Sequence, residues 1–281
     1  TGKFAPRMDL SGYYDPVVDG DMAYLGFGGV HALDLNTGSV KWAVEFKPGD
    51  KNLKRTYAPI RIEGDVLFGA GRGSVYAINK TSGETIWSSD RISKYAGLMK
   101  ARDNAIVSQV EPIGDKVFIR FGGNFSTGKG MVLKQPIGVA AFDKNSGEEI
   151  YRFTKPKEGL TNLTVLRESN TVMFADAKFL YGLDVAGKDA VENFKVTIEF
   201  KRKMGSFDVA KIGLGALGGL QGLAKASVSQ NKSRLDVPVA IIQRDGHVIV
   251  QGKQHVLGFN AEAKRIDWSV YYAAPGNPLA D

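Results

Sequence analysis

Cysteine is absent from this 281-residue sequence, and histidine occurs only three times, as His31, His247 and His255. The absence of cysteine excludes disulfide scaffolds, thiolate zinc sites, iron–sulfur clusters and cysteine nucleophiles. Three scattered histidines do not suggest a histidine-rich metal site. No apolar run approaches the ~20 residues that a membrane-spanning helix needs.

Charged segments of one sign are also scarce. The net charge is +7, which can attract anionic surfaces. The longest basic run is Lys201 to Lys203, and no dense basic block with interleaved aromatic residues predicts a nucleic-acid site. The pattern of a signal peptide, a charged segment followed by an apolar one, is not seen near residue 1. We expect either that one was removed or that the chain is a portion of a longer protein.

What the sequence does contain is typical of a globular protein rich in turns. Hydrophobic residues make up 43% of the chain and charged residues 24%, a balance that argues against disorder. There are 34 glycines, well above the usual share of ~7%. Such a surplus favours an all-β protein whose short strands are joined by tight turns.

Five segments repeat one pattern around an Asp or Asn: 30–42, 75–87, 139–151, 180–192 and 256–268. A small residue stands two places before that origin, and a Trp or Tyr stands eight places after it in four copies. The fourth copy has Glu192 there and Phe194 two places later. The pattern residues are Ala32, Asp34, Gly38 and Trp42; Ala77, Asn79, Gly83 and Trp87; Ala141, Asp143, Gly147 and Tyr151; Gly182 and Asp184; and Gly258, Asn260 and Trp268.

Each copy predicts a β-hairpin, because two short apolar stretches flank a polar turn. Gly38, Gly83 and Gly147 are expected in the left-handed conformation that closes the turn, and the Asp or Asn side chain is expected to cap the backbone two residues on. The fourth and fifth turns should differ, since Gly187 stands one place early and Ala263 replaces glycine. Small strand residues let a neighbouring sheet approach, and we expect the tryptophans to fill the space between sheets.

A second set of turns repeats in step upstream, at residues 19–21, 63–65, 113–115, 168–170 and 244–246, each between short apolar strands. Each unit is therefore four antiparallel strands, which cannot bury both faces alone. Units stacked radially form a β-propeller. We predict an all-β propeller of four-stranded blades within one domain, 1–281, with blades at about 13–46, 57–90, 108–154, 161–200 and 236–272.

The hairpins resemble the PQQ-like repeat, whose pattern is approximately Ala-x-Asp-x-x-Thr-Gly-x-x-x-Trp. Residues 33–38 with Trp42 match it best, and the resemblance covers about residues 13–272. Members of that family usually have seven or eight blades. The five visible copies therefore predict either part of a longer ring or a five-bladed variant.

Three insertions interrupt the repeats, at 91–107, 122–138 and 203–235. Residues 92–106 are expected to form a short helix. Residues 122–138 are expected to lengthen a hairpin loop, and residues 123–129 within it reproduce most of a Walker A loop. The Ser or Thr that binds Mg²⁺ is Gly130 there, and no helix is expected to follow, so a hairpin loop is favoured over nucleotide binding.

The third insertion carries an apolar stripe at helical spacing, within residues 206–230. Its candidate partner-binding residues are Ile212, Leu214, Leu217, Leu220 and Leu223. Five glycines oppose helix formation, so the segment should order only against another surface. Packing on its own propeller, docking of a partner protein and shallow membrane contact all remain open.

The enzymatic branch that the resemblance implies is the PQQ-dependent dehydrogenases, which hold the quinone over a tryptophan beside a Ca²⁺ ion. No acidic cluster here has the spacing of oxygen ligands for Ca²⁺, and we predict no catalytic residue, cofactor or metal. The resemblance to the BamB-like branch implies a non-catalytic scaffold that binds other protein subunits of an assembly in the bacterial periplasm or cell envelope. We expect no nucleic-acid partner and at most peripheral membrane contact. The alternatives are a quinoprotein dehydrogenase, or part of one, and a ligand-sensing domain of a larger receptor or kinase.

Overall fold

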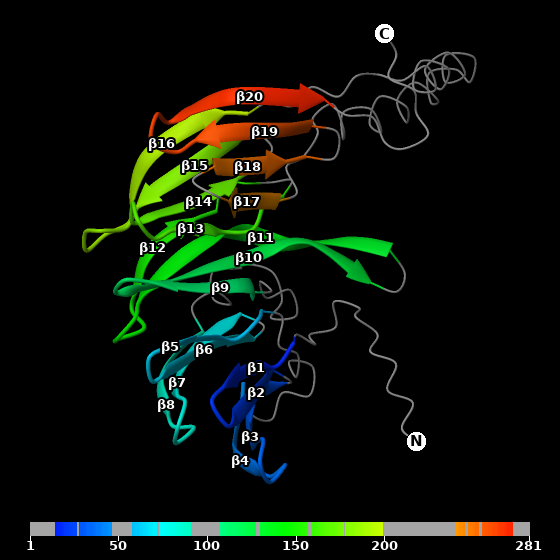
Figure 1. Ribbon diagram of the computed structural model, residues 1–281, viewed down its shortest axis with the longest axis vertical. Coiled ribbons are helices and arrows are strands. Elements are labelled where there is room, and N and C mark those ends of the chain that lie inside the picture. The colour runs from blue at the N-terminus through cyan, green and yellow to red at the C-terminus, as the bar shows by residue number, and fades with distance from the viewer. Residues whose placement is uncertain are drawn as a thin grey trace. The chain divides into compact units, whose positions relative to one another are not determined.

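The computed structural model shows an all-β chain. It describes residues 15–26, 28–46, 58–71, 73–90, 107–127, 130–154, 156, 159–176, 178–198, 240–244, 247–252 and 255–271. Within those ranges there are twenty strands and no helix, and so no helix that is long and apolar enough to cross a membrane. The strands form five four-stranded antiparallel sheets (Figure 1). The predicted propeller-like architecture of four-stranded units is thereby confirmed.

Four strands follow one another in order within each sheet, so that every sheet is a simple meander. The first sheet contains β1 (Val17–Asp19), β2 (Met22–Gly26), β3 (Gly29–Asp34) and β4 (Val40–Glu45), and the second contains β5 (Arg61–Glu63), β6 (Val66–Gly71), β7 (Ser74–Asn79) and β8 (Thr85–Ser89). The third contains β9 (Val107–Ile113), β10 (Lys116–Thr127), β11 (Gly130–Asp143) and β12 (Glu149–Phe153). The fourth contains β13 (Thr164–Leu166), β14 (Thr171–Ala175), β15 (Phe179–Asp184) and β16 (Val191–Thr197), and the fifth contains β17 (Ala240–Arg244), β18 (His247–Gln251), β19 (His255–Asn260) and β20 (Arg265–Tyr271).

The hairpin between the third and fourth strand of each sheet has the predicted chemistry. Gly38, Gly83 and Gly147 have φ of 68°, 76° and 70°, a conformation that costs glycine little. In the first of these turns Asp34 Oδ1 accepts hydrogen bonds from the backbone N–H groups of Asn36 and Thr37, at 2.9 and 3.1 Å. Residues Asn79 and Asp143 cap their own turns in the same way.

The fourth and fifth copies turn differently, as their sequences predict. Asp184 Oδ1 accepts from the N–H of Ala186 at 2.9 Å, and Asn260 Oδ1 from that of Ala263 at 2.8 Å. In the fifth turn the place of the glycine is held by Lys264, with a left-handed φ of 52°, and not by Ala263 as we expected. The Asx cap is therefore kept when the glycine is lost, because the cap needs only a side-chain oxygen and a nearby N–H group.

The insertion at 122–138 is not the loop that we expected. Residues Gly123 to Thr127 of β10 pair in register with Gly130 to Lys134 of β11, after a register shift between Phe121 and Gly123. The two strands continue as a hairpin beyond the point where β9 stops pairing (Figure 1). Backbone pairing satisfies polar groups that a loop would leave to water. Residues 123–127 of the Walker-like segment therefore lie in β10, and Gly130, the next described residue, begins β11 and not a helix.

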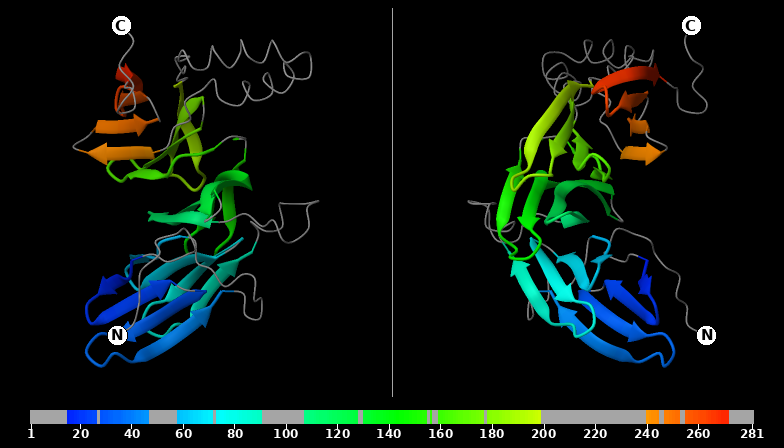
Figure 2. Two further views of the ribbon diagram at one scale, coloured as in Figure 1. Left: turned by 90° about the vertical axis from the view of Figure 1, so that its right-hand side faces the viewer. Right: turned by 60° about the vertical axis from the view of Figure 1, so that its left-hand side comes forward.

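Two compact units divide the chain. Unit 1 comprises residues 1–159, 165–173 and 183–193, and unit 2 comprises 160–164, 174–182 and 194–281. In unit 1 the first two sheets lie face to face (Figure 2) and share a core that includes Tyr24, Val30, Leu67 and Ile78. A second core in unit 1 joins the second and third sheets through residues such as Phe68, Val110 and Phe142. Apolar side chains on alternate strand positions thus bury the first three sheets against one another in unit 1.

Candidate functional site

Tryptophans join the successive sheets of unit 1. Trp42 pairs with Ala32 within its own sheet, and its Nε1–H donates to the carbonyl of Lys80 in the second sheet at 3.2 Å. Trp87 repeats the arrangement one sheet further, opposite Ala77, and donates to the carbonyl of Lys144 at 2.7 Å. We call such a contact between a sheet and the next one along the chain a junction. These two indoles thus lie between successive sheets.

The turn glycines receive the indole rings at these junctions. A Cβ atom on Gly83 would lie 2.6 Å from the Trp42 ring, and one on Gly147 would lie 2.6 Å from the Trp87 ring. Each glycine therefore serves both its own hairpin and the neighbouring sheet. Only the first of these two roles was predicted from the sequence, because the second depends on a contact between residues 41 or more places apart.

Ion pairs accompany both tryptophan junctions. Lys80, whose carbonyl accepts the Trp42 hydrogen bond, places its Nζ 2.7 Å from Asp19 of the first sheet. Lys144 places its Nζ 3.4 Å from Glu63 of the second sheet. Hydrogen bonding to Asp19 raises the pKa of Lys80, and burial opposes that shift. Ion pairs near the surface add little stability, so we expect these two to contribute less than the indole contacts.

The third sheet keeps the junction but changes its chemistry. Tyr151 replaces tryptophan, and the fully buried Lys116 instead donates from Nζ to the carbonyl of Gly187 in the fourth hairpin and pairs with Asp115. Burial raises the pKa of Tyr151 to about 12, with a further contribution from the charge of Glu192. A buried ammonium is tolerated here because a carboxylate and a carbonyl both solvate it.

In unit 2 an aromatic pair occupies the corresponding place. A Cβ atom on Gly182 would lie 2.2 Å from the Phe194 ring, so the glycine leaves room for that ring. Phe194 then packs against Phe259 of the fifth sheet, with ring centroids 5.1 Å apart. In the fourth repeat the aromatic residue, Phe194, thus stands two places later than in the other copies. It joins the fourth sheet to the fifth by a ring contact, where Trp42 and Trp87 join their sheets by a hydrogen bond to a carbonyl.

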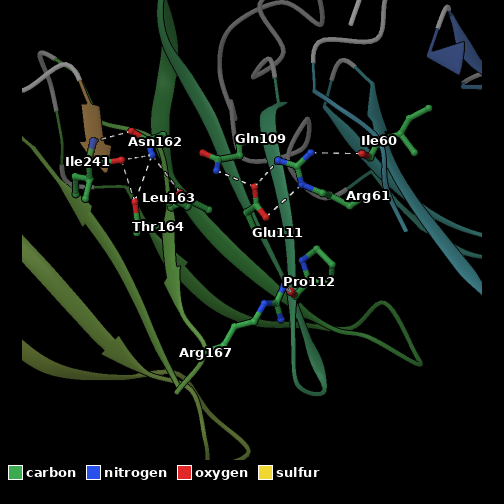
Figure 3. A network of polar contacts seen from close by, with 10 residues as sticks. All are labelled: Ile60, Arg61, Gln109, Glu111, Pro112, Asn162, Leu163, Thr164, Arg167 and Ile241. Carbon is green, nitrogen blue, oxygen red and sulfur yellow. Dashed lines mark hydrogen bonds and ion pairs between the residues drawn. The ribbon is translucent and has the colours of Figure 1, made fainter. Parts of the chain in front are cut away.

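A polar network links the first strands of successive sheets (Figure 3). Arg61 on β5 reaches Glu111 on β9 through two bonds, Nη2 to Oε1 at 2.9 Å and Nε to Oε2 at 3.3 Å. Gln109 donates to the same carboxylate at 3.0 Å. A two-pronged guanidinium–carboxylate pair of this kind fixes orientation as well as distance.

The same kind of tie recurs at the next two sheets. Arg167, directly after β13, donates from Nη2 to the carbonyl of Pro112 on β9 at 3.3 Å. Asn162, just before β13, brackets Ile241 on β17: its Oδ1 accepts from the Ile241 N–H, and its Nδ2 donates to the Ile241 carbonyl, both at 2.8 Å. Thr164 also donates to that carbonyl, at 3.2 Å. Figure 3 shows these side chains pointing at the neighbouring strand in each case.

The polar side chains of this network bond to one another or to the backbone of the neighbouring sheet. Glu111 accepts from Arg61 and Gln109, and Asn162 reproduces the two bonds that a paired strand residue would make. Within the described residues no three His, Asp or Glu side chains gather as ligands for a metal ion.

Sequence reasoning missed this network, although a signal for it was present. Arg61 stands between Ile60 and Ile62, and Glu111 stands between Val110 and Pro112, so each is a lone charge in a short apolar strand. A charge at such a place has to find a partner, because burial without one is costly. The partner lies in another repeat, and the sequence spacing of 50 residues does not reveal it.

The remaining predicted residues lie as follows. Ala141 pairs with Tyr151, and Gly258 pairs with Trp268. Trp268 differs from the other two tryptophans: its ring covers Gly258 of its own sheet, and 46% of the residue is exposed. The candidate partner-binding residues Ile212, Leu214, Leu217, Leu220 and Leu223, and the helix expected at 92–106, lie outside the described residues.

Comparison with known proteins supports the resemblance over part of the chain. Residues 4–120 match the family model described as outer membrane protein assembly factor BamB. No curated protein matches the sequence.

Solved structures share the fold at low sequence identity. A computationally designed protein, Ika8, has a TM-score of 0.55 at 8% identity, covering 93% of this chain and 62% of its own. The quinohemoprotein alcohol dehydrogenase of Comamonas testosteroni has a TM-score of 0.55 at 12% identity, covering 95% of this chain and 44% of its own. The quinohemoprotein alcohol dehydrogenase ADHIIG of Pseudomonas putida HK5 has a TM-score of 0.54 at 11% identity, with 92% and 42% covered.

The chain spans less than two thirds of the length of each of these three proteins. At such identities they show a shared fold alone. The resemblance to the PQQ-like repeat family that the hairpin residues predicted is therefore confirmed over residues 4–120, where the chain matches the BamB family model.

Proposed function

We propose that this chain is a non-catalytic β-propeller scaffold that holds other proteins in a bacterial cell-envelope assembly, with its five sheets as blades of one domain. The observation that carries the proposal is that charged side chains on, or directly after, the first strands bond to neighbouring sheets. Arg61, Glu111 and Arg167 are all spent on contacts between sheets. The family match over residues 4–120, to an outer membrane protein assembly factor, supports the envelope setting.

Rigid sheets joined in this way suit a platform whose insertions make the contacts. We propose that the apolar residues of 206–230, Ile212, Leu214, Leu217, Leu220 and Leu223, form one such contact. Their glycine-rich context favours ordering on a partner, since a partner supplies the apolar surface that offsets the lost chain entropy.

The test is capture of envelope proteins by the purified chain and by two deletion variants. Removal of 206–230 is expected to abolish capture of defined outer-membrane assembly subunits and to leave the β-sheet circular dichroism unchanged. Removal of 124–133, the paired tip of the β10–β11 hairpin, is the matched control and is expected to retain capture. If the 206–230 deletion still captures everything that the parent captures, this insertion is not the binding element.

Enzyme activity is tested separately by adding PQQ and Ca²⁺. We expect no quinone absorbance on the protein and no dye-linked oxidation of alcohols or sugars. If oxidation appears on reconstitution and is lost in Glu111→Gln, the chain is a quinoprotein dehydrogenase and not a scaffold. Glu111 would then bind a cofactor in place of Arg61.

A further inference from the structure

One face of the fifth sheet is exposed, although the equivalent face of the second sheet is buried. In the second sheet Phe68, Ala77 and Trp87 lie opposite one another on adjacent strands, and they pack into a core shared with the third sheet. In the fifth sheet the same register positions hold Ile249, Gly258 and Trp268. By strand alternation this outer face comprises Ile242, Ile249, Val256, Gly258, Trp268 and Val270.

The outer face of the fifth sheet is open where its counterpart is closed. Trp87 is 7% exposed, whereas Trp268, Ile242 and Val270 are 46%, 49% and 54% exposed. Val270 lies beside Trp268 on β20, and Ile242 lies on the same face at the other edge of the sheet. An exposed apolar face that contains a tryptophan is a typical protein–protein contact surface. The two preceding tryptophans show what such an indole binds in this protein: a hairpin with an Asp or Asn origin, a left-handed glycine and a free carbonyl after the origin residue.

One described hairpin of that kind has no tryptophan on it. Gly83 and Gly147 are covered by Trp42 and Trp87, whereas a Cβ on Gly38 would meet no atom within 4 Å. The Gly38 turn has the same left-handed φ and the same Asx cap as the two covered turns. Leu35, the residue whose carbonyl corresponds to those of Lys80 and Lys144, is an apolar residue that is 52% exposed. The Asp34–Gly38 turn therefore has the features of the two turns that bind a tryptophan, but no described tryptophan contacts it.

We propose that two copies of this chain associate head to tail, with Trp268 of one copy docked on the Asp34–Gly38 hairpin of the other. The indole Nε1–H then donates to the Leu35 carbonyl, and the ring lies over Gly38. The contact is heterologous, since donor and acceptor are different surfaces, and each dimer keeps one free donor and one free acceptor for further growth or closure. This inference concerns a different surface from 206–230 and does not depend on the scaffold function.

Sedimentation velocity of the full chain over a range of concentrations tests the association. The wild type is expected to self-associate, and Trp268→Ala is expected to raise the dissociation constant at least about tenfold, as for a central interface tryptophan. Gly38→Asn is expected to do the same. Asparagine tolerates the left-handed turn, yet its side chain fills the space that the indole needs.

Gly20→Asn is the matched control for the acceptor variant. Gly20 is a left-handed glycine (φ 56°) in the β1–β2 hairpin of the same sheet, with nothing within 4 Å of a Cβ position. Its substitution is expected to leave self-association unchanged. If Gly20→Asn weakens association as much as Gly38→Asn does, the proposal is wrong.

Mixing the two interface variants tests the head-to-tail geometry. Trp268→Ala keeps an intact acceptor and Gly38→Asn keeps an intact donor, so an equimolar mixture should form one-to-one dimers although each variant alone is monomeric. A symmetric contact, or closure within a single chain, predicts no gain on mixing. Either that result, or a wild type that stays monomeric up to about 0.1 mM, would overturn the proposal.

Discussion

At the scale of single residues, the hairpin glycines carry two constraints that reinforce one another. Gly83 needs a left-handed φ of 76° to close its turn, and it must also lack a side chain so that the Trp42 ring can lie 2.6 Å from its Cβ position. Gly64 carries only the first constraint, since its φ is 59° and nothing lies within 4 Å. The two positions therefore separate backbone strain from steric exclusion within one sheet.

Gly83→Ala is expected to lower the free energy of unfolding by about 2–4 kcal/mol, because alanine both resists the left-handed region and displaces the indole. Gly64→Ala is expected to cost only about 1–2 kcal/mol, from backbone strain alone. Urea denaturation of both variants measures the difference. Equal losses would show that the indole contact adds nothing to the demand for glycine.

The Asx caps are the second device at this scale. Asp143 Oδ1 accepts from the N–H groups of Asn145 and Ser146 at 3.0 and 2.8 Å and from the Ser146 hydroxyl at 3.0 Å. The hydrogen bonds from Ser146 are the main cause of the lowered pKa of Asp143, and the charge of Lys116 adds to the shift. In the second sheet Asn79 makes the two backbone bonds without a charge.

Because Asp143 can be protonated and Asn79 cannot, the Asp143 turn is predicted to make stability depend on pH. Because the folded-state pKa of Asp143 lies below its ordinary value of 3.8, the carboxylate stabilises the fold above that value, and the contribution is lost as pH falls through the lowered pKa. Asp143→Asn keeps the cap and does not titrate, so its stability should fall less than that of the wild type between about pH 5 and 3. The difference is expected to stay under about 1 kcal/mol, since solvent screens the group. Parallel curves for the two proteins would contradict this account.

At the scale of elements, short sheets depend on ties between their first strands. β13 and β17 have three and five residues, and strands this short bring few backbone bonds of their own. Asn162 supplies a pair of bonds to Ile241 that imitates backbone pairing, with both distances at 2.8 Å. Asn162 thereby ties the fifth sheet to the fourth within unit 2, beside the Thr164 bond and the Phe194–Phe259 contact.

Asn162→Ala is expected to cost about 2–4 kcal/mol, because it leaves the N–H and the carbonyl of the buried Ile241 without these partners. Thr164→Val removes one bond to the same carbonyl and keeps the volume, so a loss of about 1 kcal/mol is expected. Thermal unfolding followed by circular dichroism ranks the two variants. A loss for Thr164→Val as large as that for Asn162→Ala would mean that the bracket is not what holds β17.

At the scale of the whole molecule, the chain is a series of sheets in which each junction is local. The junction around Gly83 lies in unit 1, and the Asn162 bracket lies in unit 2. In repeat architectures, stability is approximately a sum over units and their nearest-neighbour interfaces. The effects of two substitutions on the free energy of unfolding should therefore add when they lie at different interfaces, and should not add when they lie at the same one.

Gly83→Ala combined with Asn162→Ala is expected to be additive within about 0.5 kcal/mol, since the two sites share no partner. Gly83→Ala combined with Trp42→Ala should not be additive. Once the indole is gone, the cost of alanine at Gly83 should fall to that measured at Gly64. Double-mutant cycles in urea check both statements, and additivity of the Trp42 pair would show that ring and glycine act independently.

Much of the local structure could be predicted because its causes are local. The Asx caps, the left-handed glycines at Gly38, Gly83 and Gly147 and the four-stranded order all follow from residues within one repeat. The paired extension at Gly123 to Lys134 was mistaken for a loop, because glycine-rich polar composition favours loops unless two such segments face one another in register. The exposed position of Trp268 was missed for a related reason, since its motif is the same as that of Trp42 and Trp87.

The sequence by itself determined the repeat, its hairpin chemistry and the propeller-like architecture, since side-chain alternation and turn residues act over a few places in the chain. Only the tertiary structure decided which charged residues are tied together, as Arg61 and Glu111 are across 50 residues, and which copies of the tryptophan motif find a neighbouring sheet. The physical reason is that a junction is a property of two repeats. Trp42, Trp87 and Trp268 follow the same local rule, but among the described residues a hairpin of the next sheet lies against Trp42 and Trp87, whereas Trp268 is 46% exposed.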